Sequence, residues 1–366
     1  MAFKIFMCVF PLPLVSLPPL NCRKCMRYVA GDVLYVLARK YPGFEYAALV
    51  RSENSAARVR EAYPNVRVVL GSLDDADLLK REAAWADLVL RHHNNAADAS
   101  DHESAARAIA AGLVEGHTES RPGYWLHTGG TGILTYFDTV ENRFGEPPGR
   151  IFDDLDGVEV LTSFPDEAFH RNVDKVVLEC GTAHADMVRT AIVCPPTIYG
   201  NGRGPVSGRS RQCYEMAKVI LTKGYVPIVG TGLATMDNVH IQDLTQAYIL
   251  LIEAALAGNA SPELWGARGY LVAATGEHVW GPLARTMAAK TQEMGLLKGD
   301  GGIKEYQMSK EEALETAGFE ALSWGLNSRC KGRRLNKFLG WKAEHPSLND
   351  EVPGIVRSEA KRLGLL

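Results

Sequence analysis

The segment Thr190–Gly204, which reads TAIVCPPTIYGNGRG, constrains the fold more than any other part of the sequence. It begins with an uncharged run of β-branched and small apolar residues, which is typical of a buried strand. Pro195 and Pro196 then end that strand, because proline has no N–H group to donate to a sheet. Glycines follow at positions 200, 202 and 204. Ligands of open α/β sheets bind beyond the carboxyl ends of the strands, so the segment predicts a pocket wall that leads into a second lobe.

Apolar runs of strand length alternate with helical patterns on both sides of this segment. The alternation predicts an α/β fold with a Rossmann-like, doubly wound parallel sheet in residues 1–199. Residues 200–366 are rich in helical patterns and predict a smaller substrate lobe, with Rossmann elements interleaved near residues 225–260. The expected strands of the sheet are 4–10, 44–50, 66–70, 86–90, 124–128 and 188–194, and a helix is expected near 166–180.

Composition excludes several classes of protein. A formal net charge of −3 over 366 residues offers no basic surface for nucleic acid. The seven cysteines are scattered, which is typical of reduced thiols and predicts a cytoplasmic protein that holds no metal. Prolines at positions 11, 13, 18 and 19 would break a membrane helix in the apolar N-terminal run, so no membrane partner is expected.

Four short motifs carry a resemblance to a known family. They are Leu126–Gly132 (LHTGGTG), Cys194–Gly200 (CPPTIYG), Asn238–Leu244 (NVHIQDL) and Leu339–Trp341 (LGW). In this order and spacing, from about Tyr28 onward, the chain resembles an extended or atypical short-chain dehydrogenase/reductase of the nucleoside-diphosphate-sugar epimerase/dehydratase-like kind. The NmrA-like branch, which keeps the fold for regulation, is an alternative within the same resemblance.

The resemblance implies a nicotinamide cofactor lying across the carboxyl ends of the strands, and a small-molecule substrate in the second lobe. It also implies a homodimer, because family members often pair through a four-helix interface. Tyr199 and His240 are the implied substrate contacts. The implied cofactor contacts are Gly31, Arg51, Thr128, Lys175, Cys194, Pro195, Pro196 and Thr197.

The residue after the second strand indicates which cofactor is preferred. An acidic residue there binds the ribose 2′-hydroxyl of NAD, whereas an arginine accommodates the 2′-phosphate of NADP. Arg51 occupies this position, so NADP is favoured and NAD remains the alternative.

The family's glycine-rich phosphate loop is largely missing. Residues 8–26 are rich in proline, leucine and cysteine, and only Gly31 remains of the motif. We therefore expect weak cofactor binding and expect residues 8–26 to pack poorly on the core. One hypothesis is that a splicing or gene-model error replaced the native loop; sequencing the transcript tests it, and a diverged loop is the alternative.

The family's acid/base pair, Tyr-x-x-x-Lys, is incomplete. Lys175 matches the lysine, but Arg171 stands at the tyrosine position and cannot give up its proton. A helix that includes His170 would turn that side chain away from Lys175. Thr128 or Thr131 is expected to hold the substrate oxygen, with Lys175 on the cofactor ribose.

Two kinds of function therefore stay open. The first is an NADP-preferring oxidoreductase that acts on the carbonyl or alcohol of a small metabolite with a non-standard proton donor. The second is a nucleotide-sensing regulatory protein, which the missing tyrosine favours. Sugar-nucleotide epimerisation or dehydration ranks lower, because it needs that tyrosine, and no motif identifies the substrate.

Overall fold

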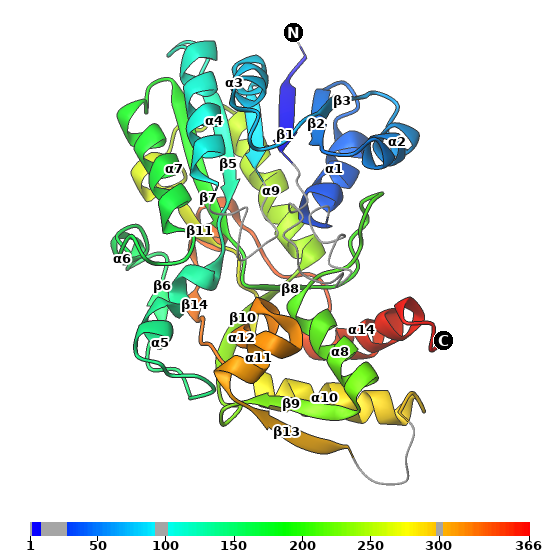
Figure 1. Cartoon of the computed structure of the whole chain (residues 1–366). Helices are drawn as coiled ribbons and strands as arrows, with labels where there is room; N and C mark the ends of the chain where they lie inside the picture. Colours follow the sequence, from blue (N-terminus) through cyan, green and yellow to red (C-terminus); the bar gives the residue numbers. More distant parts are fainter. Residues whose placement is uncertain (1, 9–27, 92–101, 298–302) are drawn as a thin grey trace.

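The computed structural model describes residues 2–8, 28–91, 102–297 and 303–366 (Figure 1). Its central sheet has seven strands in the order β11-β7-β5-β4-β1-β2-β3, and every neighbouring pair is parallel. The predicted Rossmann-like sheet is therefore confirmed. The strands are β1 (Lys4–Cys8), β2 (Glu45–Val50), β3 (Val66–Leu70), β4 (Leu88–Arg91), β5 (Gly123–Thr128), β7 (Val188–Cys194) and β11 (Tyr270–Val272).

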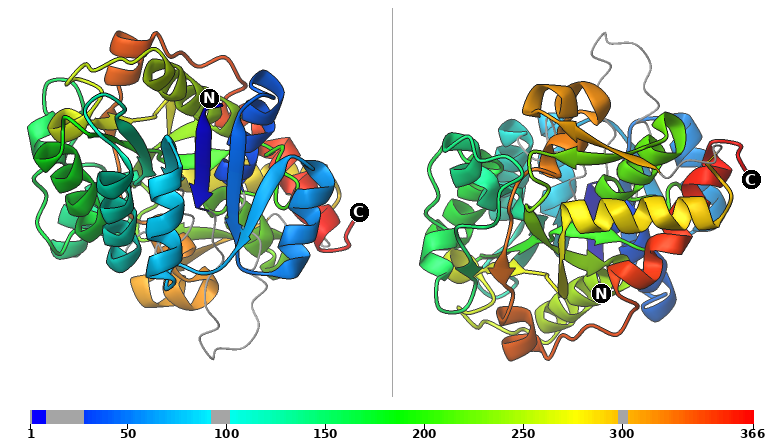
Figure 2. Two further views of the ribbon diagram at one scale, coloured as in Figure 1. Left: turned by 90° about the horizontal axis from the view of Figure 1, so that it is seen from above. Right: turned by 90° about the horizontal axis from the view of Figure 1, so that it is seen from below.

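Helices cover both faces of this sheet (Figure 2). Each helix buries an apolar stripe, so the sheet separates two hydrophobic clusters. One face carries α1 (Tyr28–Lys40), α2 (Glu53–Ala62) and α9 (Ile241–Leu256), and the other carries α3 (Ala76–Trp85), α4 (Glu103–Gly116) and α7 (Arg171–Ala183).

The second lobe has its own hydrophobic cluster beneath the carboxyl ends of the large sheet (Figure 1). Its strands form a three-stranded sheet, β12-β10-β8, and a pair, β13-β9. The strands are β8 (Thr197–Tyr199), β9 (Tyr225–Val229), β10 (Thr235–His240), β12 (Gly276–Val279) and β13 (Lys304–Met308). The helices are α8 (Gln212–Lys223), α10 (Trp280–Glu293), α11 (Lys310–Ala317), α12 (Phe319–Ser323) and α14 (Leu348–Arg362).

Short elements complete the connections between the lobes. β6 pairs with β14 in parallel, which ties a loop of the first lobe to the C-terminal part of the chain. These elements are η2 (Thr131–Thr135), α5 (Tyr136–Val140), β6 (Phe152–Asp153), α6 (Val158–Leu161), η3 (Gly266–Arg268), β14 (Cys330–Lys331) and α13 (Arg334–Leu339).

The chain returns to the first lobe later than the sequence predicts. β9 belongs to the second lobe, whereas α9 packs on the large sheet and β11 forms its edge. The interleaved Rossmann elements thus span 241–272 rather than 225–260, and the lobe boundary at residues 199/200 remains a proposal.

Two further expectations meet the structure here. Cys8 ends β1 and is fully buried, so the prediction of poor packing is wrong for that residue, while residues 9–26 lie outside the described part of the chain. None of the helices among the described residues combines the length and the apolar character needed to cross a bilayer.

Candidate active site

A pocket of about 150 Å³ lies between the two lobes, at the carboxyl ends of β5 and β7. The first lobe supplies the turn after β5 and the residues that precede α7, and the second lobe supplies the start of α8, part of β10 and α12. The lining residues are Thr128, Gly129, Gly130, Thr131, Gly132, Thr135, Phe169, His170, Pro195, Pro196, Ile198, Arg211, Gln212, Met236, Phe319, Glu320 and Ser323.

The glycine turn after β5 makes room for two side chains of the pocket wall. A Cβ atom at Gly130 would lie 3.1 Å from Nε2 of His170, and one at Gly132 would lie 2.9 Å from the ring of Phe169. Larger residues at these positions would therefore push the histidine and the phenylalanine out of place. The turn is a device for packing the ends of β5 and α7 closely around the pocket.

Thr128 and Thr131, predicted as contacts for the substrate oxygen, both line the pocket. The Thr128 hydroxyl forms a hydrogen bond with the hydroxyl of Tyr248 on α9, which fixes its rotamer. The Thr131 carbonyl accepts a hydrogen bond from Ser328 Oγ at 2.7 Å, which anchors the turn to the C-terminal part of the chain. Both threonines are buried.

Lys175 is not part of this pocket. Its ammonium group forms an ion pair with Asp166 at 2.8 Å on an exposed side of α7, and it holds the pKa of that carboxyl below its ordinary value. This placement does not support the ribose and proton-transfer roles expected from the family motif. The neighbouring Arg171 is the first residue of α7, and its Nε and Nη1 atoms are buried without a hydrogen bond to any described residue.

His170, which the sequence places on the wrong side of a helix, lines the pocket instead. The expectation fails because α7 begins only at Arg171, and His170 precedes it in a left-handed conformation with φ of 71°. The side chain therefore does not follow the helical rotation, and the turn directs it toward Gly130. Histidine is a common general acid/base. His170 therefore gives the pocket an ionisable side chain, although the tyrosine of the family motif is absent from this sequence.

A buried polar cluster lies behind the glycine turn. Asp174, one turn into α7, accepts a hydrogen bond from the Tyr270 hydroxyl at 3.0 Å and lies 3.6 Å from Nε2 of His127. Burial lowers the pKa of His127 to about 4, despite that carboxylate, so the imidazole is neutral. Burial likewise raises the pKa of Cys194, which packs against Gly129 and does not line the pocket. The cluster supports the wall from behind.

Some residues of the segment after β7 line the pocket, and others are buried in the core. Pro195 and Pro196 line the pocket, as the sequence predicts. Thr197 is fully buried and donates a hydrogen bond to the sulfur of Met236 at 3.1 Å. Thr197–Tyr199 forms strand β8, which pairs with β10.

The two expected substrate contacts, Tyr199 and His240, are not among the residues that line the pocket. The Tyr199 hydroxyl donates to the Pro346 carbonyl at 3.0 Å, and its ring packs edge-on against His240. His240 caps α9 and stacks on His345, whose Nδ1 lies 2.7 Å from Oδ1 of Asp243. Ligand atoms of the latter three residues lie within 4.8 Å of one another, but this hydrogen-bonded arrangement accounts for them without an ion.

Gly31 and Arg51 lie at the other end of the expected cofactor site. A Cβ atom at Gly31 would come within 2.9 Å of the Gly204 Cα, so this glycine allows α1 to approach the loop after β8. Arg51 follows β2 directly and precedes Ser52, the N-cap of α2. The residues that correspond to the family's phosphate loop fall largely within residues 9–27, outside the described part of the chain.

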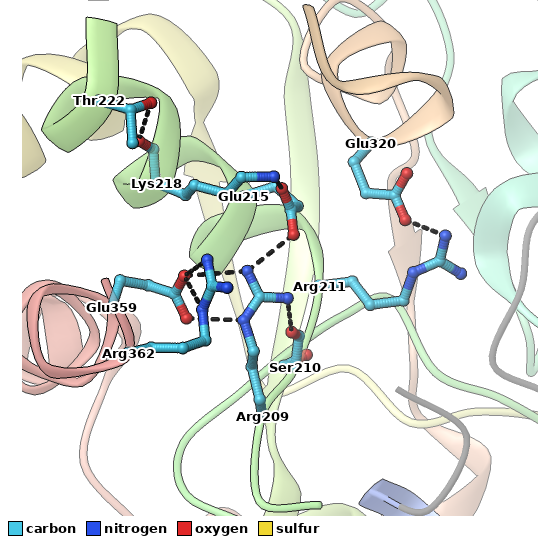
Figure 3. A network of polar contacts seen from close by, with 9 residues as sticks. All are labelled: Arg209, Ser210, Arg211, Glu215, Lys218, Thr222, Glu320, Glu359 and Arg362. Carbon is cyan, nitrogen blue, oxygen red and sulfur yellow. Dashed lines mark hydrogen bonds and ion pairs between the residues drawn. The ribbon is translucent and has the colours of Figure 1, made fainter. Parts of the chain in front are cut away.

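The second lobe contributes a wall that the sequence analysis missed. Arg211 at the start of α8 forms an ion pair with Glu320 on α12, as Figure 3 shows. The ring of Phe319 stacks on Phe169 of the first lobe, with centroids 5.2 Å apart. No local pattern in the sequence marks Arg211, Phe319 or Glu320 as pocket residues.

Together, the parallel sheet, the glycine turn after β5 and the pocket between the lobes define a dinucleotide-dependent enzyme fold of the short-chain dehydrogenase/reductase type. The sequence of residues 170–263 matches the model of the NAD dependent epimerase/dehydratase family. The chain is also 37% identical over 346 residues to the oxidase ucsJ of an Acremonium species, covering 92% of this chain and 96% of that protein. The chain belongs to the NAD dependent epimerase/dehydratase family.

Solved structures agree with this fold. A dTDP-glucose 4,6-dehydratase from Streptomyces venezuelae, with NAD and TYD bound, superposes with a TM-score of 0.63 at 15% identity, covering 99% of this chain and 98% of the dehydratase. A UDP-glucose 4-epimerase from Thermotoga maritima, with UDP-glucose, superposes with a TM-score of 0.61 at 13% identity over 99% and 100% of the two chains. At these identities the likeness concerns the fold.

Proposed function

We propose that the protein is an NAD(P)-dependent oxidoreductase that interconverts the carbonyl and alcohol forms of a small molecule in the pocket between the lobes. The family membership and the similarity to an oxidase support a redox reaction. The observation that carries the proposal is the position of His170, an ionisable side chain on the pocket wall beside Thr128 and Thr131.

In this proposal His170 replaces the tyrosine of the family motif. An imidazole transfers protons near neutral pH, which the Arg171 guanidinium cannot do. The hydroxyls of Thr128 and Thr131 hold the substrate oxygen, and Tyr248 orients the first of them. His170 then donates a proton to that oxygen during reduction, or removes one from the alcohol during oxidation.

The described residues fit a dinucleotide at the carboxyl end of the sheet. Gly31, Arg51, Thr128, Pro195 and Pro196 lie on the segments that would hold it, and the last three of these residues line the pocket. A bound nicotinamide cofactor supplies or accepts the two electrons of the reaction. Arg51 favours NADP over NAD, since its guanidinium suits a 2′-phosphate.

Two alternatives have specific support. The solved structures of a dehydratase and an epimerase favour a sugar-nucleotide substrate. Arg171 at the expected tyrosine position favours a regulatory protein that binds the cofactor without turnover.

We also propose a cytoplasmic homodimer. A shallow groove between α4 and α7, lined in part by Ala111, Val114 and Ala183, offers a face for a second copy. Sedimentation of the purified protein tests the dimer.

Purified protein should be titrated with NADPH and NADH, and then mixed with aldehydes and ketones while the absorbance of the reduced cofactor is followed. Oxidation of NADPH that depends on both substrate and His170 supports the oxidoreductase. Cofactor binding with no turnover of any carbonyl or alcohol supports the regulatory alternative instead.

A further inference from the structure

Residues 326–334 form a strap that joins the two lobes beside the pocket. The strap runs along β10 of the second lobe, where the Ser328 N–H donates to the Thr235 carbonyl and the Asp237 N–H donates to the Ser328 carbonyl, each at 3.0 Å. It then forms β14, which pairs with β6 of the first lobe (Figure 1). The Ser328 hydroxyl also donates to the Thr131 carbonyl at 2.7 Å. The strap therefore connects the glycine turn of the pocket to the second lobe.

Two buried carboxylates bind the backbone of the strap, one from each lobe. Oδ2 of Asp237, on β10, accepts a hydrogen bond from the Cys330 N–H at 2.6 Å. Oδ1 of Asp154, directly after β6, accepts from the N–H groups of Arg333 and Arg334 at 2.7 and 3.2 Å. Asp237 is 6% exposed and Asp154 is 0% exposed. Because the closed strap keeps both carboxyl groups out of water, their ionisation affects its stability.

The surroundings of Asp237 disfavour its charge. Burial raises the pKa of Asp237 to about 7, from an ordinary value of 3.8. The Cys330 N–H opposes this rise, the Glu277 carboxylate on β12 adds to it, and the Arg329 guanidinium of the strap opposes it. Arg329 is also paired with Glu277 at 2.6 Å. Asp237 is therefore protonated in mildly acidic solution and charged in alkaline solution.

Asp154 titrates at the other anchor of the strap. Burial raises the pKa of Asp154 to about 6. The N–H groups of Arg333, Val272 and Arg334 oppose the rise, as does the Arg334 guanidinium. The Arg333 guanidinium is paired with the neighbouring Asp153 at 2.7 Å. Both anchors thus become charged as the pH rises from mildly acidic to alkaline.

Ionisation favours opening of the strap. Local opening returns Asp237 to water, where its carboxyl group ionises at the ordinary value of 3.8 instead of about 7. Between these two values the open form loses its proton before the closed form does, so opening becomes more favourable as the pH rises. The contribution of Asp237 to closure is complete below pH 3.8 and is lost as the pH rises through about 7.

We propose that the strap is a pH-sensitive element that holds the glycine turn in place in acid and opens more readily as the pH rises, with Asp237 as the main titrating group. Opening moves the Ser328 hydroxyl away from the Thr131 carbonyl, so the pocket wall loses one of its supports. The proposal rests on the function proposed above in one respect, namely that this pocket is the functional site, and it names a way in which that site is regulated.

Hydrogen exchange of the full-length protein tests the strap without substrate or cofactor. Exchange is followed by mass spectrometry between about pH 5 and pH 8 and corrected for the intrinsic effect of pH on exchange. Protection of peptides that cover residues 326–334 should fall about tenfold or more over this range. Peptides that cover residues 129–135 should lose protection over the same range. Strap protection that stays constant or increases with pH would overturn the proposal, and a glycine turn that does not follow the strap would remove the link to the pocket.

Variants then assign the effect to Asp237. In Asp237→Asn the amide oxygen still accepts from the Cys330 N–H but carries no charge, so the fall in strap protection should be about tenfold smaller than in the wild type. Glu305→Gln removes an exposed carboxylate of the same lobe, in the pair with Arg285, and is the matched control; its strap should behave as in the wild type. An equal fall in Asp237→Asn and the wild type would reject Asp237 as the titrating group. The wild-type series needs no variant and decides the proposal even if Asp237→Asn does not fold.

Ser328→Ala tests the contact between the strap and the pocket. This variant should lower the protection of residues 129–135 at every pH, because it removes the hydrogen bond to the Thr131 carbonyl, and should leave the pH dependence of the strap unchanged. Unchanged protection of the glycine turn in this variant would contradict the proposed support. The oxidoreductase function fails separately. If the strap opens with pH but no carbonyl or alcohol is turned over, the strap's pH response stands and the redox function does not.

Discussion

At the α1 end of the molecule the carboxylate of Asp32 is completely buried and fully engaged. It accepts hydrogen bonds from the backbone N–H of Arg203 at 2.7 Å, from the Arg203 guanidinium and from Thr245 Oγ1 at 2.7 Å. In the pocket between the lobes, Arg211 is also paired with a carboxylate, but on a wall that faces open space. Arg203 thus binds a carboxylate in the interior of the protein, whereas Arg211 binds one on the wall of the pocket.

The difference lies in what surrounds each pair. The Asp32 junction joins α1, α9 and the loop after β8 through a fully buried carboxylate, so its hydrogen bonds contribute to stability. The polar groups of the pocket wall border the cavity, where they can contact a substrate. Substitutions at the Asp32 junction should therefore lower the stability of the fold, and substitutions in the pocket should lower activity.

The largest expected effect is on activity at the pocket. His170→Asn should lower turnover by about one hundred- to ten-thousandfold, because it removes the proposed proton donor. Asparagine tolerates the left-handed backbone of this position, so the fold should survive. Steady-state kinetics at saturating cofactor, with a denaturation curve as the control, measure this. Activity within a factor of three of the wild type would remove His170 from the mechanism.

At the Asp32 junction the effect should appear in stability. Asp32→Asn should lower the free energy of unfolding by about 3 kcal/mol, since it breaks a buried ion pair and unbalances several hydrogen bonds. Urea denaturation measures the change. The exposed pair of Arg285 and Glu305 provides the control, where Glu305→Gln should cost at most about 1 kcal/mol. A loss no larger than the control's would contradict the contrast between the two regions.

Close to the same junction, His240 should make stability depend on pH. Burial and the neighbouring His345 lower the pKa of His240 to about 4, below the ordinary value of 6.5. The unfolded chain therefore takes up this proton first, so stability is complete above pH 6.5 and falls as the pH drops toward 4. His240→Asn keeps a good N-cap without a titratable ring. Its loss of stability over this range should be about 2 kcal/mol smaller than that of the wild type. If the free energy of unfolding falls equally with pH in the two proteins, His240 is not the source of the pH dependence.

Arg51 allows the expected cofactor site to be tested separately from the pocket. We expect weak binding overall, with NADPH preferred to NADH. Arg51→Asp should lower the ratio of NADPH affinity to NADH affinity about tenfold, because it removes a partner of the 2′-phosphate and offers an acceptor for the 2′-hydroxyl. Fluorescence titration of both cofactors measures the ratio. Tight binding with NADH preferred by the wild type would contradict the expectation.

The smallest effect is expected at Lys175, which shares a helix with the pocket residues but faces outward. Lys175→Met should change turnover less than about twofold and stability by at most about 1 kcal/mol, as is usual for exposed ion pairs. The same kinetics and denaturation curves suffice. A tenfold loss of turnover would return the lysine to the site.

Local sequence patterns were sufficient to locate several of the residues that line the pocket. Strand periodicity located β5 and β7. The pocket is lined by residues at or just past their ends, namely Thr128, Thr131, Pro195 and Pro196. The same reasoning misplaced His170 because it started the helix near residue 166. A few residues' error in a helix boundary changes which side chain faces the pocket, and here a left-handed residue before α7 decided it.

The sequence by itself determined the alternation of strands and helices, and hence the parallel sheet and the edge of the sheet at which the pocket lies. Apolar periodicity is local and survives without knowledge of any partner. Only the tertiary structure decided that Lys175 faces Asp166, that His170 faces the glycine turn and that Arg211 meets Glu320. Such pairings join side chains from separate elements, and their geometry depends on how the two lobes pack, which no pattern within one segment records.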